Sequence, residues 1–197
     1  MAHKFLHLAV TPAVQSAQAH YYGRAARLPA SSERDVMSRA EKGFILARDS
    51  FYLSSVSENG WPYIQHRGGA PGFLRVLDQS TLGFADYGGN RQLLSTGNVS
   101  RNDRVALFLM DYPRRRRLKI LGHVRMLDAH DHPVELEQLA DQDVREQVER
   151  LFLIDVVAFD WNCPQYITPR YSPNEVEELL DPLRQRIAEL EGQLASR

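Results

Sequence analysis

Apolar and polar residues alternate from residue 51 onward, and this period of two is typical of strands with one buried face. We expect strands at residues 51–57, 61–67, 72–77, 81–85, 104–111, 118–127 and 151–159. Glu58, Asn59 and Gly60 form a turn signal that joins the first two strands in a hairpin. Six or seven strands with mostly short turns predict a mainly β fold with flanking helices, built on a closed or nearly closed antiparallel barrel.

Helix signals precede these strands and interrupt them. Thr11 and Pro12 predict a helix start, with a capping hydroxyl followed by proline at the first helical position, and this helix should run to about residue 27. Ser32, with Asp35 three residues later, predicts a second start and a helix to residue 49. Residues 90–98 predict one or two helical turns, and residues 131–150 predict a broken helix.

The C-terminal region carries the clearest helix signal. Ser172-Pro173-Asn174-Glu175 combines a capping box with proline at the first helical position. Pro182 predicts a break or kink. A short heptad stripe follows from Leu180, Leu183, Ile187, Leu190 and Leu194. The stripe either packs on the chain's own barrel or contacts a partner subunit.

The length of 197 residues corresponds to one compact domain. Within it we expect an N-terminal helical arm packed on the barrel at residues 1–50, the barrel at residues 51–170, and the C-terminal helix at residues 171–197.

Composition and charge exclude several classes of function. The chain is 43% hydrophobic and 25% charged, as in globular proteins, and its net charge of -1 gives no general attraction for nucleic acid or anionic membranes. Any bound anion therefore needs a local cluster of cations. Cys163 is the single cysteine, which excludes an internal disulfide and favours a structural thiol and a cytoplasmic location. We expect neither a signal peptide nor a membrane span.

Two glycine-containing segments are candidate binding sites, whereas the common nucleotide, zinc-protease and hydrolase motifs are absent from the sequence. In the first, Gln65, His66 and Arg67 end a strand before Gly68 and Gly69. Glycine lets a backbone approach a flat ligand closely, although the loop could also need glycine only for its dihedral angles.

The second segment runs from Asp86 to Gln92 and places Asn90 and Arg91 at an expected helix start. Free N–H groups and a guanidinium there would form a phosphate site, and the alternative is an ordinary loop-to-helix junction.

An arginine run, 114–117, follows Pro113 and predicts a solvated hairpin tip. Strand alternation then places Arg117 and Lys119 on one face and Arg116 on the other. His130 and His132 flank an expected surface turn, so the histidines predict no metal site.

Several of these segments resemble the pyridoxamine 5′-phosphate oxidase family of FMN-binding split barrels. The similarity covers roughly residues 45–128, and residues 162–167 resemble the tail of a subgroup of that family. The segments that carry it are 57–63, 65–69, 88–92, 102–108 and 118–122.

The resemblance implies a homodimer of six-stranded antiparallel split β-barrels with one FMN in each of two clefts at the subunit interface. It implies that the flavin ring and ribityl chain contact Gln65, His66, Arg67 and Gly68. The phosphate would be held by Asn90, Arg91 and Gln92. Arg117, with Lys119 on the same face, would reach the flavin from the partner chain. We expect the substrate pocket beside Trp161, Asn162 and Gln165.

Two departures argue against oxidation of a vitamin B6 phosphate. Gly89-Asn90-Arg91 stands where the oxidase has a Ser-Arg-Lys phosphate clamp, and the oxidase's C-terminal basic motif has no counterpart here. Three functions stay open: an FMN oxidoreductase acting on a small organic substrate with NAD(P)H supplied by diffusion, a non-catalytic flavin carrier or sensor, and a haem or tetrapyrrole protein with His66 as ligand. For a flavoprotein, Arg67 or Arg117 would stabilise the reduced, anionic flavin.

Overall fold

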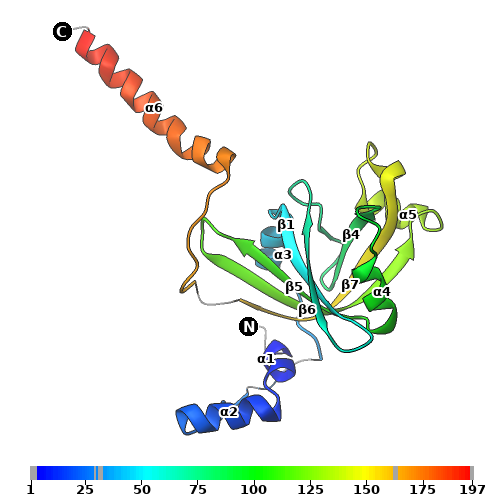
Figure 1. The fold of residues 1–197 in the computed structure, drawn as a ribbon. Helices are drawn as coiled ribbons and strands as arrows, with labels where there is room; N and C mark the ends of the chain where they lie inside the picture. The colour runs from blue at the N-terminus through cyan, green and yellow to red at the C-terminus, as the bar shows by residue number, and fades with distance from the viewer. Residues whose placement is uncertain (1–3, 29, 31–32, 162–163, 196–197) are drawn as a thin grey trace. The chain divides into compact units, whose positions relative to one another are not determined.

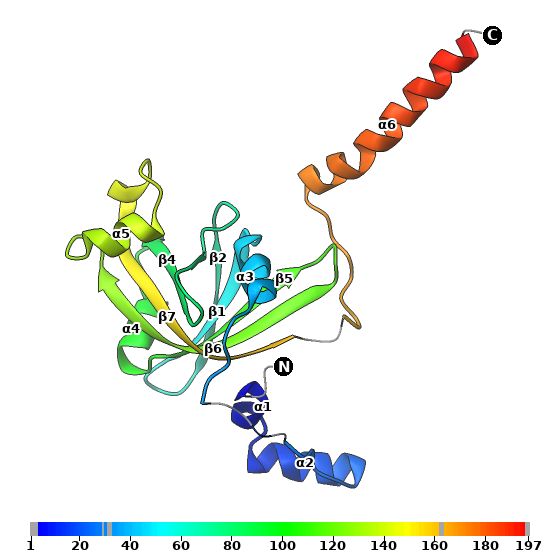
Figure 2. The same ribbon diagram turned by 180° about the vertical axis from the view of Figure 1, so that it is seen from behind.

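A seven-stranded sheet curls around the main core of the protein (Figures 1 and 2). The computed structural model describes residues 4–28, 30, 33–161 and 164–195. The strand order is β2-β1-β5-β6-β7-β4-β3, and β1 pairs antiparallel with β2 and β5 while β7 pairs antiparallel with β4 and β6. The strands are β1 (Ser50–Val56), β2 (Pro62–Gly68), β3 (Arg75–Val76), β4 (Thr81–Tyr87), β5 (Arg104–Asp111), β6 (Arg116–Asp128) and β7 (Val148–Trp161). The predicted mainly β, antiparallel fold is confirmed, with β3 as a two-residue seventh strand.

The helices are α1 (Lys4–Ala9), α2 (Pro12–Tyr22), α3 (Arg39–Leu46), α4 (Leu94–Arg101), α5 (Pro133–Leu139) and α6 (Pro173–Ala195), with a 3-10 turn at Arg145–Gln147. Thr11 caps α2 as predicted, since its side chain accepts a hydrogen bond from the Val14 N–H. The helix ends earlier than residue 27 because Gly23 adopts a left-handed conformation with φ of 73°.

Strand alternation accounts for the main core. Along β5, every second residue from Val105 to Asp111 is buried. β7 differs because Leu151, Phe152, Leu153 and Ile154 are all nearly inaccessible, so both of its faces are covered. One face joins the main core, and the other forms a second cluster with α5.

The start of α3 corrects the sequence prediction. Ser38, rather than Ser32, caps this helix, and Glu41 accepts a hydrogen bond from the Ser38 backbone N–H at 2.9 Å. Glu41 also accepts a 2.7 Å bond from the indole N–H of Trp161. Asp35, expected in the first turn of the helix, accepts hydrogen bonds from the Phe159 and Lys4 N–H groups, each at 3.2 Å. It therefore ties two distant segments together.

Glu41 should make stability depend on pH. Its burial raises the pKa, but the hydrogen bonds from Ser38 and Trp161 outweigh burial and hold the pKa below its ordinary value of 4.5. A depressed pKa means that the stabilisation is complete above the unfolded-state pKa and is lost as the pH falls through the folded-state pKa. We expect Glu41→Gln to lower the free energy of unfolding at pH 7 and to match the unsubstituted chain near pH 3. Urea unfolding at both pH values measures this, with exposed Glu33→Gln as control; a constant difference would contradict it.

Residues 111–116 and 164–195 form a second compact unit, which is described by itself. Its helix α6 begins as predicted, with Ser172 and Glu175 bonded reciprocally at 2.8 to 3.3 Å. The predicted break at Pro182 is absent, and α6 is continuous. Because α6 is exposed, water can hydrate the carbonyl that loses its N–H partner to proline. No helix among the described residues is long and apolar enough to cross a membrane.

Candidate functional site

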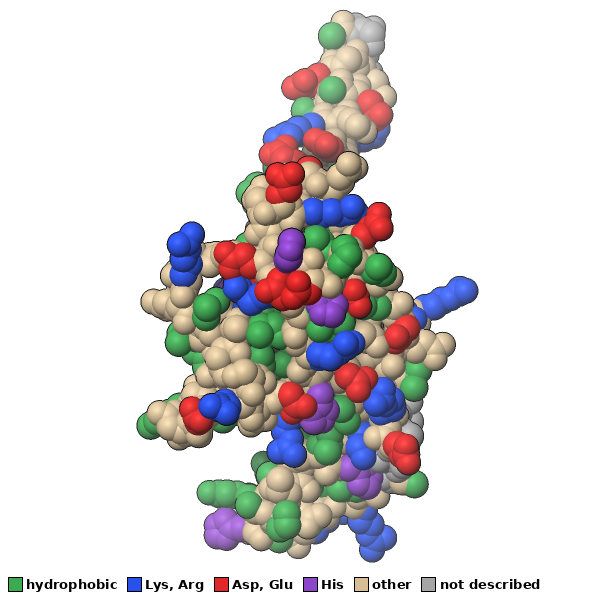
Figure 3. Space-filling view, turned by 90° about the vertical axis from the view of Figure 1, so that its right-hand side faces the viewer, with side chains coloured by type: hydrophobic (Ala, Val, Ile, Leu, Met, Phe, Trp, Pro, Cys, Tyr) green, Lys and Arg blue, Asp and Glu red, His purple; other side chains and the backbone are tan. Residues whose placement is uncertain are grey.

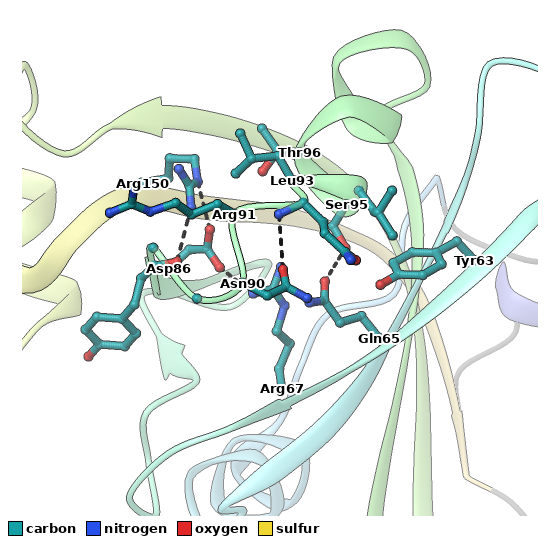
Figure 4. A pocket seen from close by; sticks show the side chains of 15 residues that line it. Tyr63, Gln65, Arg67, Asp86, Asn90, Arg91, Leu93, Ser95, Thr96 and Arg150 are labelled. Carbon is teal, nitrogen blue, oxygen red and sulfur yellow. Dashed lines mark hydrogen bonds and ion pairs between the residues drawn. The ribbon is translucent and has the colours of Figure 1, made fainter.

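A pocket of about 230 Å³ opens where β2, the end of β4 and the start of α4 meet (Figure 4). Residues 86–96 form one wall, Tyr63, Gln65 and Arg67 of β2 form another, and Arg150 comes from β7. On the face shown in Figure 3, acidic and basic side chains are interspersed. Binding of an anion therefore depends on a local cluster of cations, and this pocket contains one.

Strand alternation decides which side chains of β2 face the pocket. Tyr63, Gln65 and Arg67 share its half-buried face, and Gln65 accepts a 2.7 Å hydrogen bond from the Ser95 hydroxyl. His66 lies on the opposite face, where its ring meets Tyr52 edge-on with centroids 5.6 Å apart. His66 and Gly68 line a neighbouring cavity of about 540 Å³, which shares Arg67 with the first.

Asp86 bridges two arginines at the pocket floor. One carboxylate oxygen is paired with Arg67, and the other accepts from Arg150 Nε at 2.8 Å. The side chains of Asp86, Arg67 and Arg150 are only 6%, 17% and 14% exposed. Burial lowers the pKa of Arg150, but hydrogen bonds to Asp86 and Glu149 outweigh it and raise that pKa. Arg150 therefore stays charged, and two guanidinium groups share the carboxylate of Asp86, with Glu149 as a second acidic partner of Arg150.

Arg67 also contacts the core beneath it. Its guanidinium carbon lies 5.5 Å from the ring centroids of both Phe84 and Phe152, a cation–π arrangement. Its Nε is buried without a hydrogen-bond partner. The guanidinium is thus held in place while one of its donors stays unused.

The loop between β4 and α4 has an unusual backbone. Gly89, Arg91 and Leu93 have φ of 47°, 59° and 54°, and the intervening Asn90 and Gln92 do not have positive φ. Within the loop, the Arg91 N–H donates to the Gly88 carbonyl and the Gln92 N–H donates to the Asn90 side chain, each at 3.1 Å. Left-handed conformations at non-glycine residues cost about 1–3 kcal/mol and cluster at ligand-binding sites. The loop is therefore a candidate anion clamp.

The predicted helix start at Asn90 is wrong, because α4 begins at Leu94. Asn90 instead closes a turn by accepting the Gln92 N–H at 3.1 Å. Leu93 occupies the cap position of α4 without a side-chain capping bond. Arg91 is exposed at the pocket and forms no ion pair with another described residue. Asn90 and Arg91 thus lie on the loop that leads to the helix and not in its first turn.

The pocket brings five predicted cofactor residues together: Gln65, Arg67, Asn90, Arg91 and Gln92. Arg117 and Lys119 line neither this pocket nor the 540 Å³ cavity. Arg117 lies over the Phe108 ring, 5.9 Å from its centroid, and its Nε is buried without a partner. Lys119 pairs with Asp160 at 2.8 Å.

Of the expected substrate residues, Trp161 lines neither the pocket nor the 540 Å³ cavity. Trp161 packs edge-on against Phe44, with centroids 4.8 Å apart, and donates its N–H to Glu41. Gln165 is exposed in the second unit. Asn162 and Cys163 lie outside the described residues.

Sequence reasoning assigned no role to Arg150 or to Ser95. Arg150 faces Asp86 across the β4–β7 pair, so the register of that pair would have indicated the contact. The sequence signal is limited to a charged residue directly before an apolar run, residues 151–154. No group of three or more potential metal-ligating side chains is present in the part of the chain that the structure describes.

Residues 37–160, which include the whole pocket, match the pyridoxamine 5′-phosphate oxidase family. The chain belongs to this family. No curated protein matches its sequence.

Several solved structures are similar. HupZ of Group A Streptococcus is 13% identical, with a TM-score of 0.49 over 68% of this chain and 100% of that one. A pyridoxamine 5′-phosphate oxidase-related, FMN-binding protein of Nostoc punctiforme is 14% identical, with a TM-score of 0.43 over 57% and 73% of the two chains. An F420 reductase is 16% identical, with a TM-score of 0.46 over 63% and 98%.

Proposed function

We propose that the chain binds FMN and acts as an FMN-dependent oxidoreductase on a small organic substrate. The observation that carries the proposal is the gathering of Arg67, Arg91 and Arg150 around one pocket in which Asp86 is the single carboxylate. A phosphate monoester carries about -1.5 to -2 charge at pH 7 and offers three acceptor oxygens. The donors of the pocket match that group in charge and in hydrogen-bonding chemistry.

The three arginines would act differently. Arg150 has protein partners on all three of its nitrogens, namely Asp86, Glu149 and the Tyr87 carbonyl, so its part is to position Asp86. Arg67 keeps one unused donor. Arg91 has no competing carboxylate, so it can form a forked pair with phosphate oxygens at little cost in lost contacts. The N-terminus of α4 adds a partial positive charge.

The size of the pocket supports a cofactor site that extends beyond this pocket. Ligand pockets commonly measure about 300–1,000 Å³, so 230 Å³ suits the phosphate and adjoining chain of FMN but not the whole cofactor. The 540 Å³ cavity, which contains Gly68 and Gly69 and shares Arg67 and Asp86 with the pocket, would take more of the cofactor. We propose that a second copy covers the remainder, with Arg117 and Lys119 facing the cofactor of the other protomer.

In this proposal the flavin supplies hydride or single-electron transfer when bound. The chain's residues bind and orient it. Asp86 and the Phe84 ring fix the Arg67 guanidinium, whose permanent positive charge would favour a negative charge on the reduced ring system. No described side chain has to move a proton for hydride transfer. NAD(P)H or the substrate would enter from solvent.

An absorption spectrum of the purified protein tests the cofactor directly. We expect two flavin bands and about one FMN per chain, and reduction of those bands by NADH or NADPH would support an oxidoreductase. Bound flavin that reacts with neither nicotinamide nor oxygen would favour a carrier or sensor instead. A Soret band in place of the flavin bands would contradict the FMN proposal and direct attention to His66.

Arg91→Ala should weaken FMN binding about tenfold to hundredfold, because a charge-assisted hydrogen bond contributes about 1.5–3 kcal/mol. Riboflavin, which lacks the phosphate, should bind the variant and the unsubstituted chain equally. Quenching of flavin fluorescence on titration measures both dissociation constants.

Arg101→Ala is the matched control, since this arginine lies at the other end of α4, is 68% exposed and is absent from the pocket lining. It should leave both constants unchanged. An equal loss of FMN and riboflavin affinity in Arg91→Ala would contradict the assignment of Arg91 to the phosphate.

A further inference from the structure

The C-terminal helix carries an apolar stripe that nothing in its own unit covers. α6 has 23 residues, about 34 Å at 1.5 Å per residue, and none of them is buried. The stripe residues are between 36% and 70% exposed: Val176, Leu180, Leu183, Ile187, Leu190 and Leu194. Helices in proteins gain most of their stability from packing an apolar face against other elements, so an exposed stripe of this length indicates a partner.

The spacing of the stripe specifies the kind of partner. Steps of four, three, four, three and four residues place Leu180, Ile187 and Leu194 at position a of a heptad and Val176, Leu183 and Leu190 at position d. Pro182 falls at position c and Gly192 at position f, both on the side away from the seam. The two residues least suited to a helix therefore leave the seam intact, which is the arrangement of a coiled coil.

We infer that α6 pairs with α6 of a second copy of this chain in a parallel, two-stranded coiled coil. At the centre of the seam, Ile187 at position a lies between Leu183 and Leu190 at position d, the combination that favours two strands. The helix spans about three heptads, which is short for independent association. The coiled coil therefore adds to other contacts between the copies, and it needs no bound flavin.

The charges beside the seam select the parallel orientation. Arg186 occupies position g, and Glu191 occupies position e of the following heptad. In a parallel, in-register pair these positions face each other across the seam, which gives two attractive contacts, one on each side. Arg186 now pairs within its own helix with Glu189 at 2.8 Å, so it is already extended along the surface.

An antiparallel pair would be disfavoured by the same residues. Antiparallel helices place e beside e and g beside g, and full overlap of this stripe would centre on residue 185. Arg184 would then face Arg184, Arg186 would face Arg186, and Glu177 would face Glu191 of the other copy. Like charges across a seam are destabilising, so the sequence specifies one orientation.

Disulfide trapping in the full-length chain tests the inference. In a background with Cys163→Ser, the substitution Leu183→Cys places a thiol at a central d position, where Cα atoms about 4.4–6.8 Å apart can be bridged. We expect a covalent dimer in a glutathione buffer, formed about tenfold or more faster than with Gln185→Cys, because the coiled coil holds the seam thiols together. Gln185 is the matched control, two residues away at the outward position f. Light scattering should give the mass of two chains of 22.5 kDa.

Three outcomes would overturn the inference. The first is an equal rate of cross-linking for Leu183→Cys and Gln185→Cys, and the second is a mass of three or more chains. The third is cross-linking of Leu183→Cys only to a chain that carries Ile187→Cys, because residue 183 faces residue 187 in the antiparallel pair. Packing of the stripe on the chain's own barrel would give the first of these. Because the measurement is made on thiols, the result is independent of whether FMN binds.

Charge exchange gives a second readout in the Leu183→Cys background. Arg186→Glu should slow cross-linking, since it places acidic side chains opposite each other. Adding Glu191→Arg should restore the rate of cross-linking. The pair between residue 186 and Glu189 within the helix stays broken in this double variant, so its loss would not explain the recovery. Absence of rescue would contradict the parallel register.

Discussion

Replacing Asp86 with alanine should destabilise the fold by about 3–5 kcal/mol, because it leaves Arg67 and Arg150 buried beside each other without their shared counter-ion. The cost comes mainly from Arg67, which has no ion pair with another described residue, whereas Arg150 keeps Glu149. Urea unfolding followed by tryptophan fluorescence would show a lower midpoint with a similar slope.

Two further variants separate this effect from a general loss of surface charge. Glu149→Gln removes a partner of Arg150 that is 47% exposed, and it should cost less than about 1 kcal/mol. Adding Arg150→Met to Asp86→Ala removes the cation that shared Asp86 with Arg67 and should recover part of the loss. Equal midpoints for Asp86→Ala and Glu149→Gln would show that the network does not stabilise the pocket floor.

Phe84→Ala should have an effect of similar size, about 3–5 kcal/mol, since it opens a cavity in the main core. The Phe84 ring is 1% exposed, stacks on Phe152 with centroids 4.9 Å apart, and meets Phe51 edge-on. It also lies beneath the Arg67 guanidinium. The variant should therefore lose affinity for both FMN and riboflavin, unlike Arg91→Ala.

Phe84→Leu is the appropriate comparison, because it keeps most of the buried volume while removing the aromatic face. It should unfold between the alanine variant and the unsubstituted chain. If Phe84→Ala unfolded at the same urea concentration as the unsubstituted chain, the packing of this core would be much looser than the ring contacts indicate.

The strands were the most predictable part of the structure. β5 has the same bounds as its prediction, residues 104–111, because one buried and one accessible face impose a strict period of two. β7 was predicted shorter than it is, since charged residues interrupt the apolar pattern at its ends, Glu149 and Arg150 at the start and Asp160 near the end. The start of α3 was predicted at Ser32 but lies at Ser38, where Glu41 also accepts a bond from Trp161, a tertiary contact 120 residues away.

The site was predictable only in part. Arg67 and Arg91 could be recognised because glycines accompany them in two short segments. The pairing of Arg150 with Asp86 spans 64 residues and depends on the register of β4 against β7, which shifts next to Asp86. The left-handed conformations of Arg91 and Leu93 could not be predicted from the sequence either, since neither residue type favours them.

The two-residue strand β3 affects how the sheet can associate with other molecules. β3 pairs only with Leu82 and Gly83 of β4, whereas β2 on the opposite border is seven residues long. Open-ended, edge-to-edge pairing of sheets needs two borders that can each pair with another molecule. A very short edge strand is a poor template for pairing with another chain, so β3 lowers the tendency of the sheet to extend through that border.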